Sequence, residues 1–348
     1  MMNTSVAVIF MALICGAPNI AAQAPAYGIP TNLPGITAAA DPPAWFNPLT
    51  ASDEDLAVFG FPPRPDAQGA PEIYKSWQRA MAASKRSIIP ELQRTDIFHG
   101  PAQITHVENS TASSKNWSAV VVESGASSYN TTTSFSIVQA EYVVPMASQA
   151  FGACTGSWDR SSTWVGIDGD NGSGAKDLFQ AGTEADASCV NGIKSQEYYA
   201  WIEWVPDKPN LELKLSGLPL FAGDDIFIQV WNTSATQGYV YIVNETTNEY
   251  LNLSVPAPSG TKLVGNSAEW VVERPLPAGN CSTCFATLTN YIWDFFSNSA
   301  AKTHGGSLYA PGSSSAIQVT MYNGSTAISY PTVLGAYAIQ FQNEGPSR

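Results

Sequence analysis

The sequence predicts an all-β domain, either a sandwich or a barrel, preceded by a proline-rich segment with two short helices. Three observations predict this. After Lys115, short stretches of alternating apolar and polar residues are separated by turns. Asn323-Gly324, between two such stretches, is typical of a tight hairpin. No stretch beyond Asn116 has the pattern of a helix of ordinary length. The 348 residues suffice for one large or two ordinary domains.

The first 22 residues predict a signal peptide. They contain no Asp, Glu, Lys or Arg, and residues 6–14 form an apolar run that is too short to span a bilayer. Ala21-Ala22-Gln23 offers a small-residue cleavage site. We therefore expect secretion into the extracellular space, and no other stretch predicts a membrane helix.

The first short helix is expected after Ser52. This residue is a favourable N-cap, residues 53–55 are acidic, and Gly60 with the two prolines after it ends the helix.

Pro71 opens the second helix. Ile73, Trp77 and Met81 recur every four residues in it and form an apolar stripe that needs a partner surface. This part of the chain is also locally basic, with Lys75, Arg79, Lys85, Arg86 and Arg94. It is either a small helical subdomain with a solvated basic face or a latch that holds on to an acidic partner at neutral pH.

The strands are expected in the second part of the chain. The clearest candidates are residues 135–144, 211–215, 226–231, 239–243 and 317–322. Periodicity alone does not distinguish a sandwich from a barrel.

Four cysteines remain once Cys15, in the expected signal peptide, is set aside. An even number in an exported chain indicates two disulfides, and we favour the local pairs Cys154–Cys189 and Cys281–Cys284 among three possible pairings. The Cys-x-x-Cys at 281–284 lacks the second half of a zinc site and a following helix, so we expect no metal.

The charge is low in amount and acidic in sign. Only 13% of residues are charged, and the formal net charge is -13 at pH 7. After residue 110 there are 10 basic and 20 acidic residues, so this part carries -10. Nucleic acid is therefore not an expected partner. A chain with few ion pairs also has little to lose when carboxylates are protonated, which fits acidic surroundings.

Two motifs stand out within the predicted strands. Trp164-Val165-Gly166-Ile167-Asp168-Gly169 leads to Leu178-Phe179-Gln180-Ala181-Gly182, and Asn266-Ser267-Ala268-Glu269-Trp270 follows later. Together with Asn116-Trp117-Ser118 and Tyr199-Ala200-Trp201-Ile202-Glu203-Trp204, these segments resemble the glutamic peptidase family G1, the eqolisins, which are secreted, pepstatin-insensitive acid proteases. The resemblance covers about residues 116–341.

The resemblance implies two packed, curved antiparallel sheets, as in lectin-like jelly rolls, with the active site on a concave face. It implies that Gln180 and Glu269 are the catalytic residues of an acid endopeptidase that needs no cofactor. Glu269 would activate the water as a general base and then act as an acid, while Gln180 would stabilise the oxyanion. Glu273 is then the obvious control, and we expect Glu273→Gln to retain activity.

Strand alternation groups the neighbours of these two residues. Trp164 and Asp168 share a face opposite Val165 and Ile167, and Tyr199, Trp201 and Glu203 share a face. These indoles, with Trp117, are either the floor of a substrate cleft or ordinary core residues. In the family reading, Asp168 and Glu203 support Glu269 and the water.

The acidic position after the Gln180 motif departs from the family. Many fungal members have Asp there, whereas this chain has Glu184, with Asp186 as a possible substitute.

Other hydrolase classes lack the residues they need. A serine peptidase requires a His near a Ser and an acid, but His304 lies in a loop-like setting, and His99 and His106 precede the predicted sandwich. No His-Glu-x-x-His zinc motif occurs. The main alternative is a carbohydrate-active sandwich, either a glycosidase or a sugar-binding module, since ten Trp and several strand carboxylates would suit it.

The predicted organisation has three parts. Residues 1–22 are a signal peptide, 23–110 a propeptide with short helices, and 111–348 a β-sandwich catalytic domain, with maturation between about Phe98 and Lys115. The expected partners are a protein or peptide substrate and the chain's own propeptide, and we expect a monomer.

Overall fold

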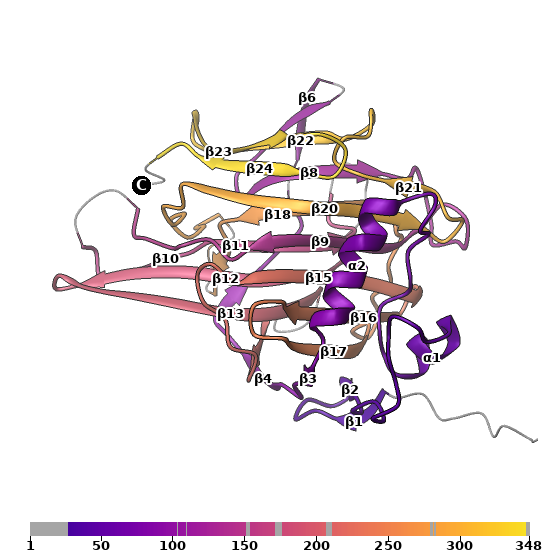
Figure 1. Cartoon of the computed structure of the whole chain (residues 1–348). Helices are drawn as coiled ribbons and strands as arrows, with labels where there is room; N and C mark the ends of the chain where they lie inside the picture. Colours follow the sequence, from indigo (N-terminus) through magenta and orange to yellow (C-terminus); the bar gives the residue numbers. More distant parts are fainter. Residues whose placement is uncertain are drawn as a thin grey trace, which may run out of the picture.

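The computed structural model describes residues 27–102, 104–108, 110–150, 154–170, 176–206, 211–278, 281 and 283–345. The expected signal peptide lies outside these residues. Two antiparallel sheets pack against each other (Figure 1), which confirms the predicted β-sandwich. The described residues contain two α-helices, both before Asn116.

We call the first sheet the site sheet. Its strands, in spatial order, are β14 (Leu213–Ser216), β13 (Ile193–Val205), β12 (Leu178–Val190), β11 (Ser162–Ile167), β18 (Ser267–Glu273), β8 (Trp117–Glu123) and β22 (Ile317–Asn323). All of these neighbours are antiparallel. β11 lies at the centre, between β12 and β18.

We call the second sheet the outer sheet. Its order is β23 (Thr326–Val333), β24 (Ile339–Asn343), β20 (Trp293–Thr303), β9 (Phe135–Val143), β15 (Asp225–Ser234), β16 (Gln237–Asn244) and β17 (Glu249–Pro256). The hairpin of β22 and β23 joins the two sheets at Gly324, whose positive φ of 61° suits the turn. The predicted Asn-Gly hairpin is thus confirmed.

Four short strands complete the second part of the chain. They are β7 (Thr111–Ser114), β10 (Trp158–Asp159), β19 (Leu276–Pro277) and β21 (Leu308–Tyr309).

The N-terminal segment contributes strands as well as helices. These are β1 (Tyr27–Pro30), β2 (Thr37–Ala39), β3 (Arg86–Ser87), β4 (Glu91–Arg94), β5 (Ile97–Phe98) and β6 (Thr105–Glu108). β4 pairs with the edge strand β14, and β2 pairs with the edge strand β17. Local patterns predicted the helices here but not these strands. For β2 and β4 the reason is that the edge strands with which they pair lie more than a hundred residues away in the sequence.

Both predicted helices are present. In α1 (Asp53–Val58), the Ser52 hydroxyl accepts a hydrogen bond from the Asp55 amide at 3.0 Å, so Ser52 is the N-cap. α2 (Pro71–Ala83) begins at the predicted proline and lies across the outer sheet (Figure 1). Its stripe residues Trp77 and Met81 are buried against aromatic residues of that sheet.

The two faces of the site sheet have different roles. Val165, Ile167 and Trp270 point into the core between the sheets. Trp164 and Trp201 lie in a separate cluster on the opposite face. This alternation follows the predicted pattern, so the face that carries Gln180 and Glu269 is the one turned away from the outer sheet.

Both expected disulfides are present. Cys154 pairs with Cys189, with 4.8 Å between their Cα atoms, and Cys281 pairs with Cys284 at 5.4 Å. No helix among the described residues has the length and hydropathy needed to cross a membrane.

Candidate active site

Gln180 and Glu269 lie in one cross-strand row of the site sheet. Gly166, on the central strand β11, is the register partner of Gln180 on β12 and of Glu269 on β18. Neighbouring strands are about 4.8 Å apart, so the two main chains are separated by roughly 10 Å. Side chains that rise from the same face over this span can act on one bound group between them.

Gly166 keeps the space between the two residues open. A Cβ at this position would lie 2.8 Å from the Trp164 ring and 2.9 Å from a Leu178 methyl carbon. Any other residue at position 166 would therefore displace the groups around Gln180.

Polar atoms of both residues remain available for a ligand. Gln180 and Glu269 are fully buried. Within the described part of the chain, no partner lies within ordinary hydrogen-bond geometry of the Gln180 Oε1 atom or of either Glu269 carboxylate oxygen. Buried polar atoms of this kind are costly unless they bind something, so they point to a site for water or substrate.

Burial raises the pKa of the Glu269 carboxyl well above its usual range, and the nearby carboxylates of Asp168 and Asp170 act in the same direction. Glu269 therefore holds its proton more tightly in this covered state than a carboxyl in water does.

A main-chain segment of the N-terminal part crosses this row. The Gln180 side-chain amide donates a hydrogen bond to the main-chain carbonyl oxygen of His99 at 2.6 Å. The His99 amide in turn donates to the Glu203 carboxylate at 2.9 Å. Since Glu203 is the register partner of Gln180, both main-chain polar groups of His99 are bound by adjacent residues of one row.

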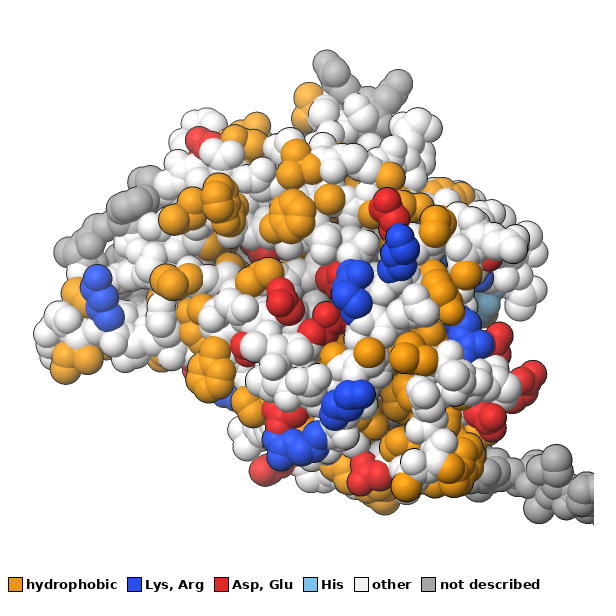
Figure 2. All heavy atoms as spheres, viewed as in Figure 1, with side chains coloured by type: hydrophobic (Ala, Val, Ile, Leu, Met, Phe, Trp, Pro, Cys, Tyr) orange, Lys and Arg blue, Asp and Glu red, His pale blue; other side chains and the backbone are white. Residues whose placement is uncertain are grey.

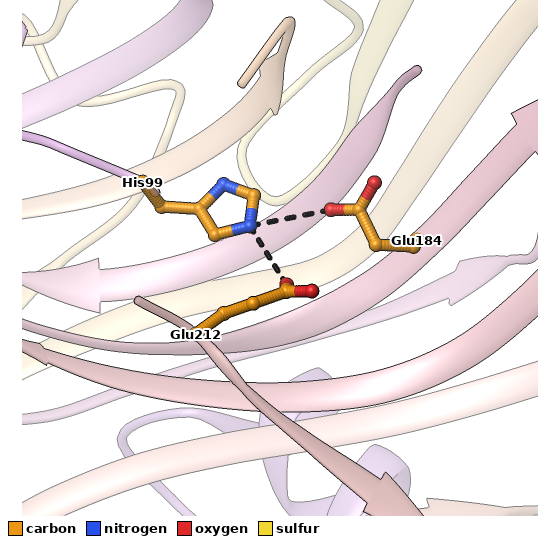
Figure 3. A group of neighbouring side chains, drawn as sticks. All are labelled: His99, Glu184 and Glu212. Atoms are coloured by element: carbon orange, nitrogen blue, oxygen red, sulfur yellow. Dashed lines mark hydrogen bonds and ion pairs between the residues drawn. The ribbon is translucent and has the colours of Figure 1, made fainter. Parts of the chain in front are cut away.

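The His99 side chain lies in a group of acidic residues that we call the carboxylate cage, formed by Glu184, Glu203, Glu212 and Glu273. Figure 3 shows one ring nitrogen of His99 facing both Glu212 and Glu184. This nitrogen, Nε2, lies 2.9 Å from Glu212 and 3.3 Å from Glu184. The Nδ1 atom lies 3.0 Å from Glu273. All of these side chains are almost completely buried.

This environment favours the charged imidazolium. Burial by itself lowers the pKa of His99, but the Glu184, Glu212 and Glu273 carboxylates overcome it and hold this pKa well above its usual range. With a carboxylate at each ring nitrogen, both nitrogens act as donors, as only the protonated ring allows. The ring also stacks on Trp201, with 3.9 Å between centroids.

The three predicted tryptophans are buried on the site face. Trp117 meets Trp164 edge to face, with 4.8 Å between ring centroids. The Trp164 indole donates to Glu273 at 2.9 Å, and that of Trp201 donates to the Ser162 hydroxyl at 2.9 Å. Trp164 and Trp201 thus pack as core residues and also form the floor beneath the cage.

Asp168 binds main chain rather than the dyad. Its carboxylate accepts hydrogen bonds from the amides of Val264, Gly265 and Asn266 at 2.7, 3.1 and 2.9 Å. Burial raises the pKa of Asp168 to about 6, although these hydrogen bonds act to lower it. Asp168 therefore holds the loop that leads into β18 and, through it, the position of Glu269.

Glu184 and Asp186 have different surroundings, although both are fully buried on β12. Glu184 faces His99, whereas Asp186 forms an ion pair with Arg160 at 2.6 Å. Of these two acids, Glu184 is the one in the cage.

Glu273 is not the bystander that its sequence context indicated. Its other carboxylate oxygen accepts a hydrogen bond from the Asn116 amide at 2.9 Å, and the side chain is 1% exposed. Because Glu273 belongs to the cage, a Glu273→Gln variant is a poor control for Glu269.

Sequence reasoning missed two residues of the site. His99 was set aside because it precedes the sandwich, and Glu212, just before β14, belongs to no motif. Tyr199, which does lie in a motif, donates to Glu212 at 2.7 Å. Only the pairing of β4 with β14 brings residues 91–94 and 213–216 together, and His99 and Glu212 lie just beyond that pairing.

His99, Glu184 and Glu212 are also residue types that can ligate a divalent cation, and their ligand atoms lie within 4.8 Å of one another. The imidazolium supplies a positive charge beside these carboxylates, so the arrangement does not require an ion.

Comparison with known proteins identifies the family of the chain. The model of the Peptidase A4 family matches residues 116–340. Aspergillopepsin-2 of Aspergillus niger is 28% identical in an alignment of 221 residues that covers 59% of this chain and 70% of that protein. Scytalidopepsin B of Scytalidium lignicola is 32% identical over 139 residues, which are 40% of this chain and 46% of that protein.

A solved structure shares the fold. Scytalido-glutamic peptidase with a transition state analog inhibitor superposes with a TM-score of 0.52 at 22% identity, covering 66% of this chain and 98% of that chain. At this identity the likeness concerns the fold. The family match decides against the carbohydrate-active alternative. The chain belongs to the Peptidase A4 family, the glutamic peptidases or eqolisins, and is accordingly an endopeptidase that hydrolyses peptide bonds.

Proposed function

We propose that this chain is a secreted acid endopeptidase, made as a zymogen, with Glu269 and Gln180 as its catalytic dyad. One observation carries the proposal. The Gln180 amide donates to a peptide carbonyl that crosses the site face, in the same row as Glu269. A carbonyl held in this way is placed as the carbonyl of a bound substrate would be.

The chemistry follows from the two side chains. Ionised Glu269 takes a proton from water, and the water oxygen attacks the carbonyl carbon. Gln180 does not titrate, so its amide donates to the developing oxyanion at any acid pH. Glu269 then gives the proton to the leaving nitrogen, and the carbon–nitrogen bond breaks.

The N-terminal segment is the inhibitor of the zymogen. While His99 and its neighbours cover the row, no other peptide can reach Gln180. The segment is also held from the opposite side of the molecule, where Arg79 of α2 pairs with Glu141 at 2.6 Å and Arg86 pairs with Glu249. Figure 2 shows Lys and Arg side chains along α2 and below it, with carboxylates beside them.

Acid weakens this inhibition. Burial raises the pKa of Glu184 and, well above its usual range, that of Glu203. Glu184 and Glu203 are therefore protonated early as the pH falls, and the part of the attraction for the His99 imidazolium that these two carboxylates supply is lost. The same ring also faces Glu212 and Glu273, and the Tyr199 hydroxyl donates to Glu212. Asp186, on the same strand as Glu184, pairs with Arg160. Once the segment leaves, Glu269 is open to bulk solvent, and its pKa falls toward its ordinary range.

Secretion is part of the proposal. The two disulfides support it, since such bonds persist in oxidising compartments.

The test uses the full-length protein and its Glu269→Gln variant, incubated with denatured protein at pH 3 to 4. A Glu245→Gln variant is the matched control, because Glu245 lies in the turn between β16 and β17 of the outer sheet and its pKa is raised by burial to about 7. Wild type and control are expected to degrade the protein, and Glu269→Gln is expected to be inert. Equal activity in Glu269→Gln would refute the dyad.

A further inference from the structure

We propose that the carboxylate cage is the substrate pocket for the residue that supplies the scissile carbonyl, and that it selects a cationic side chain. The His99–Gly100 bond is then the bond that the chain presents to its own dyad. This inference rests on the proposed function and adds to it a preferred substrate and a defined processing site.

The main chain of His99 is held as that of a substrate residue. Its carbonyl oxygen accepts from Gln180, and its amide donates to Glu203. The carbonyl carbon that bears this oxygen is bonded to the nitrogen of Gly100. His99–Gly100 is therefore the bond next to the oxyanion donor.

The chain is anchored on both sides of that bond. On one side, Ile97 and Phe98 form β5 and pair with β19. On the other side, Ala102 forms an isolated bridge with Asp170 and is fully buried. Between these anchors the segment is bound by the Gln180 amide, which lies in the same row as Glu269.

The pocket remains after the segment leaves. Glu184, Glu203, Glu212 and Glu273 belong to β12, β13, the residues before β14, and β18, all outside the N-terminal part. Buried carboxylates need a cationic partner or a proton. One carboxylate oxygen of Glu203 has no hydrogen-bond partner within the described residues even with His99 in place.

The shape of the pocket favours a flat cation. Trp201 lies parallel to the imidazole, at an angle of 7° between the planes. An imidazolium, and less closely a guanidinium, can use both this stacking surface and the carboxylates at its edge. An aliphatic residue would leave the carboxylates unpaired.

Space for a longer substrate adjoins the bond. A cavity of about 610 Å³ is lined by Gly100, Pro101, Asn116 and Glu273, among others. It opens beside the segment, so peptide or water can approach the same face.

The self-cleavage step is a hydrolysis that consumes one water. The water oxygen bonds to the His99 carbonyl carbon, and the bond to the Gly100 nitrogen breaks. Glu269 takes one water proton and passes it to that nitrogen. The products end in the His99 carboxylate and begin with the Gly100 amine.

Two measurements test the proposal. The first is the intact mass and N-terminal sequence of the full-length protein after incubation at pH 4, with Glu269→Gln beside it. The expected result is a new N-terminus at Gly100 in wild type only. The second is kcat/KM, with the acid-treated protein, for a synthetic peptide of residues 94–105 and for the same peptide with Leu at the His99 position.

The His peptide is expected to be hydrolysed at least about tenfold faster than the Leu peptide, as hydrogen bonds to charged groups imply. Glu212→Gln is expected to reduce that ratio, whereas Glu245→Gln keeps it. The Leu peptide itself reports whether the Glu212→Gln protein is folded and active.

Each negative result has a distinct meaning. Degradation of denatured protein without cleavage at His99–Gly100, or with equal rates for the two peptides, overturns this inference and leaves the proposed function intact. No hydrolysis of any substrate by wild type overturns the proposed function itself. A His preference that persists in Glu212→Gln and in Glu184→Gln shows that the cage does not create it.

Discussion

Gln180 and Glu269 lie opposite each other across Gly166, one strand away from it on either side. The two residues are far apart in the sequence, but strand pairing places their main chains two strand spacings apart. Each can therefore approach the same carbonyl from a different side, one as a hydrogen-bond donor and the other as a proton acceptor.

Replacing Gln180 with Ala is expected to lower kcat by about 10² to 10³, because the oxyanion loses its donor. KM should change much less. The measurement is the hydrolysis of a peptide at pH 4. Gln229→Ala is the matched control, since Gln229 is fully buried on β15 of the outer sheet. Equal losses in the two variants would mean that the effect is structural.

Gly166→Ala is expected to impair activity more than folding. The added Cβ meets Trp164 and Leu178 at less than 3 Å and lies 3.4 Å from the Cβ of Gln180, so these neighbours must shift. Overpacking of this kind costs about 1–3 kcal/mol of stability. Urea unfolding and kcat/KM measured together would separate the two effects. Gly28→Ala serves as the control for the stability of the full-length chain, because nothing lies within 4 Å of a Cβ there.

Asp294 is expected to make the fold less stable as the pH rises. It is buried, accepts a hydrogen bond from the Thr163 hydroxyl at 2.5 Å, and burial raises its pKa to about 7. The folded state therefore binds a proton that the unfolded state releases near pH 4. The resulting stability is fully present below pH 4 and is lost as the pH rises to 7.

The shift in the pKa of Asp294 corresponds to a contribution of the order of 4 kcal/mol. Urea unfolding of the inactive Glu269→Gln protein at pH 4 and pH 7 would measure it without self-digestion. Adding Asp294→Asn should flatten the pH dependence. An unchanged slope would show that other carboxylates dominate.

The apolar stripe of α2, rather than its basic residues, is expected to hold the N-terminal segment in place. Trp77 is fully buried, so Trp77→Ala should cost about 3–5 kcal/mol. The Arg79 side chain is 51% exposed, so breaking its pair with Glu141 should cost about 1 kcal/mol or less.

This difference is measurable as premature activity. At pH 6, Trp77→Ala should process itself or digest added protein sooner than wild type, while Arg79→Ala should stay close to wild type. If Arg79→Ala activates as readily as Trp77→Ala, the ion pairs are the main restraint.

Local sequence patterns determined much of this protein. Alternation in residues 164–168 and 199–204 correctly separated the site face from the inter-sheet core, because side chains in a strand change faces at every residue. Four other features were also predictable: the Ser52 cap, the helix after Pro71, the Asn323-Gly324 hairpin and both disulfides. The first three depend on residues close in the sequence, and four cysteines allow only three pairings. That Gln180 and Glu269 belong to one site was predicted from motif resemblance alone.

Only the tertiary structure decided what surrounds that pair. His99, Glu184, Glu212 and Glu273 come from four separate segments, and nothing local in any of them signals the others. Glu184 and Glu273 meet because both are register partners of Ser162 on β11, and His99 reaches them through strand pairing between the N-terminal part and the edge of the site sheet. Glu273 contacts the His99 ring, whereas Asp168 binds the amides of a loop. The two carboxylates differ because register and long-range packing, not residue type, determine which groups a carboxylate faces.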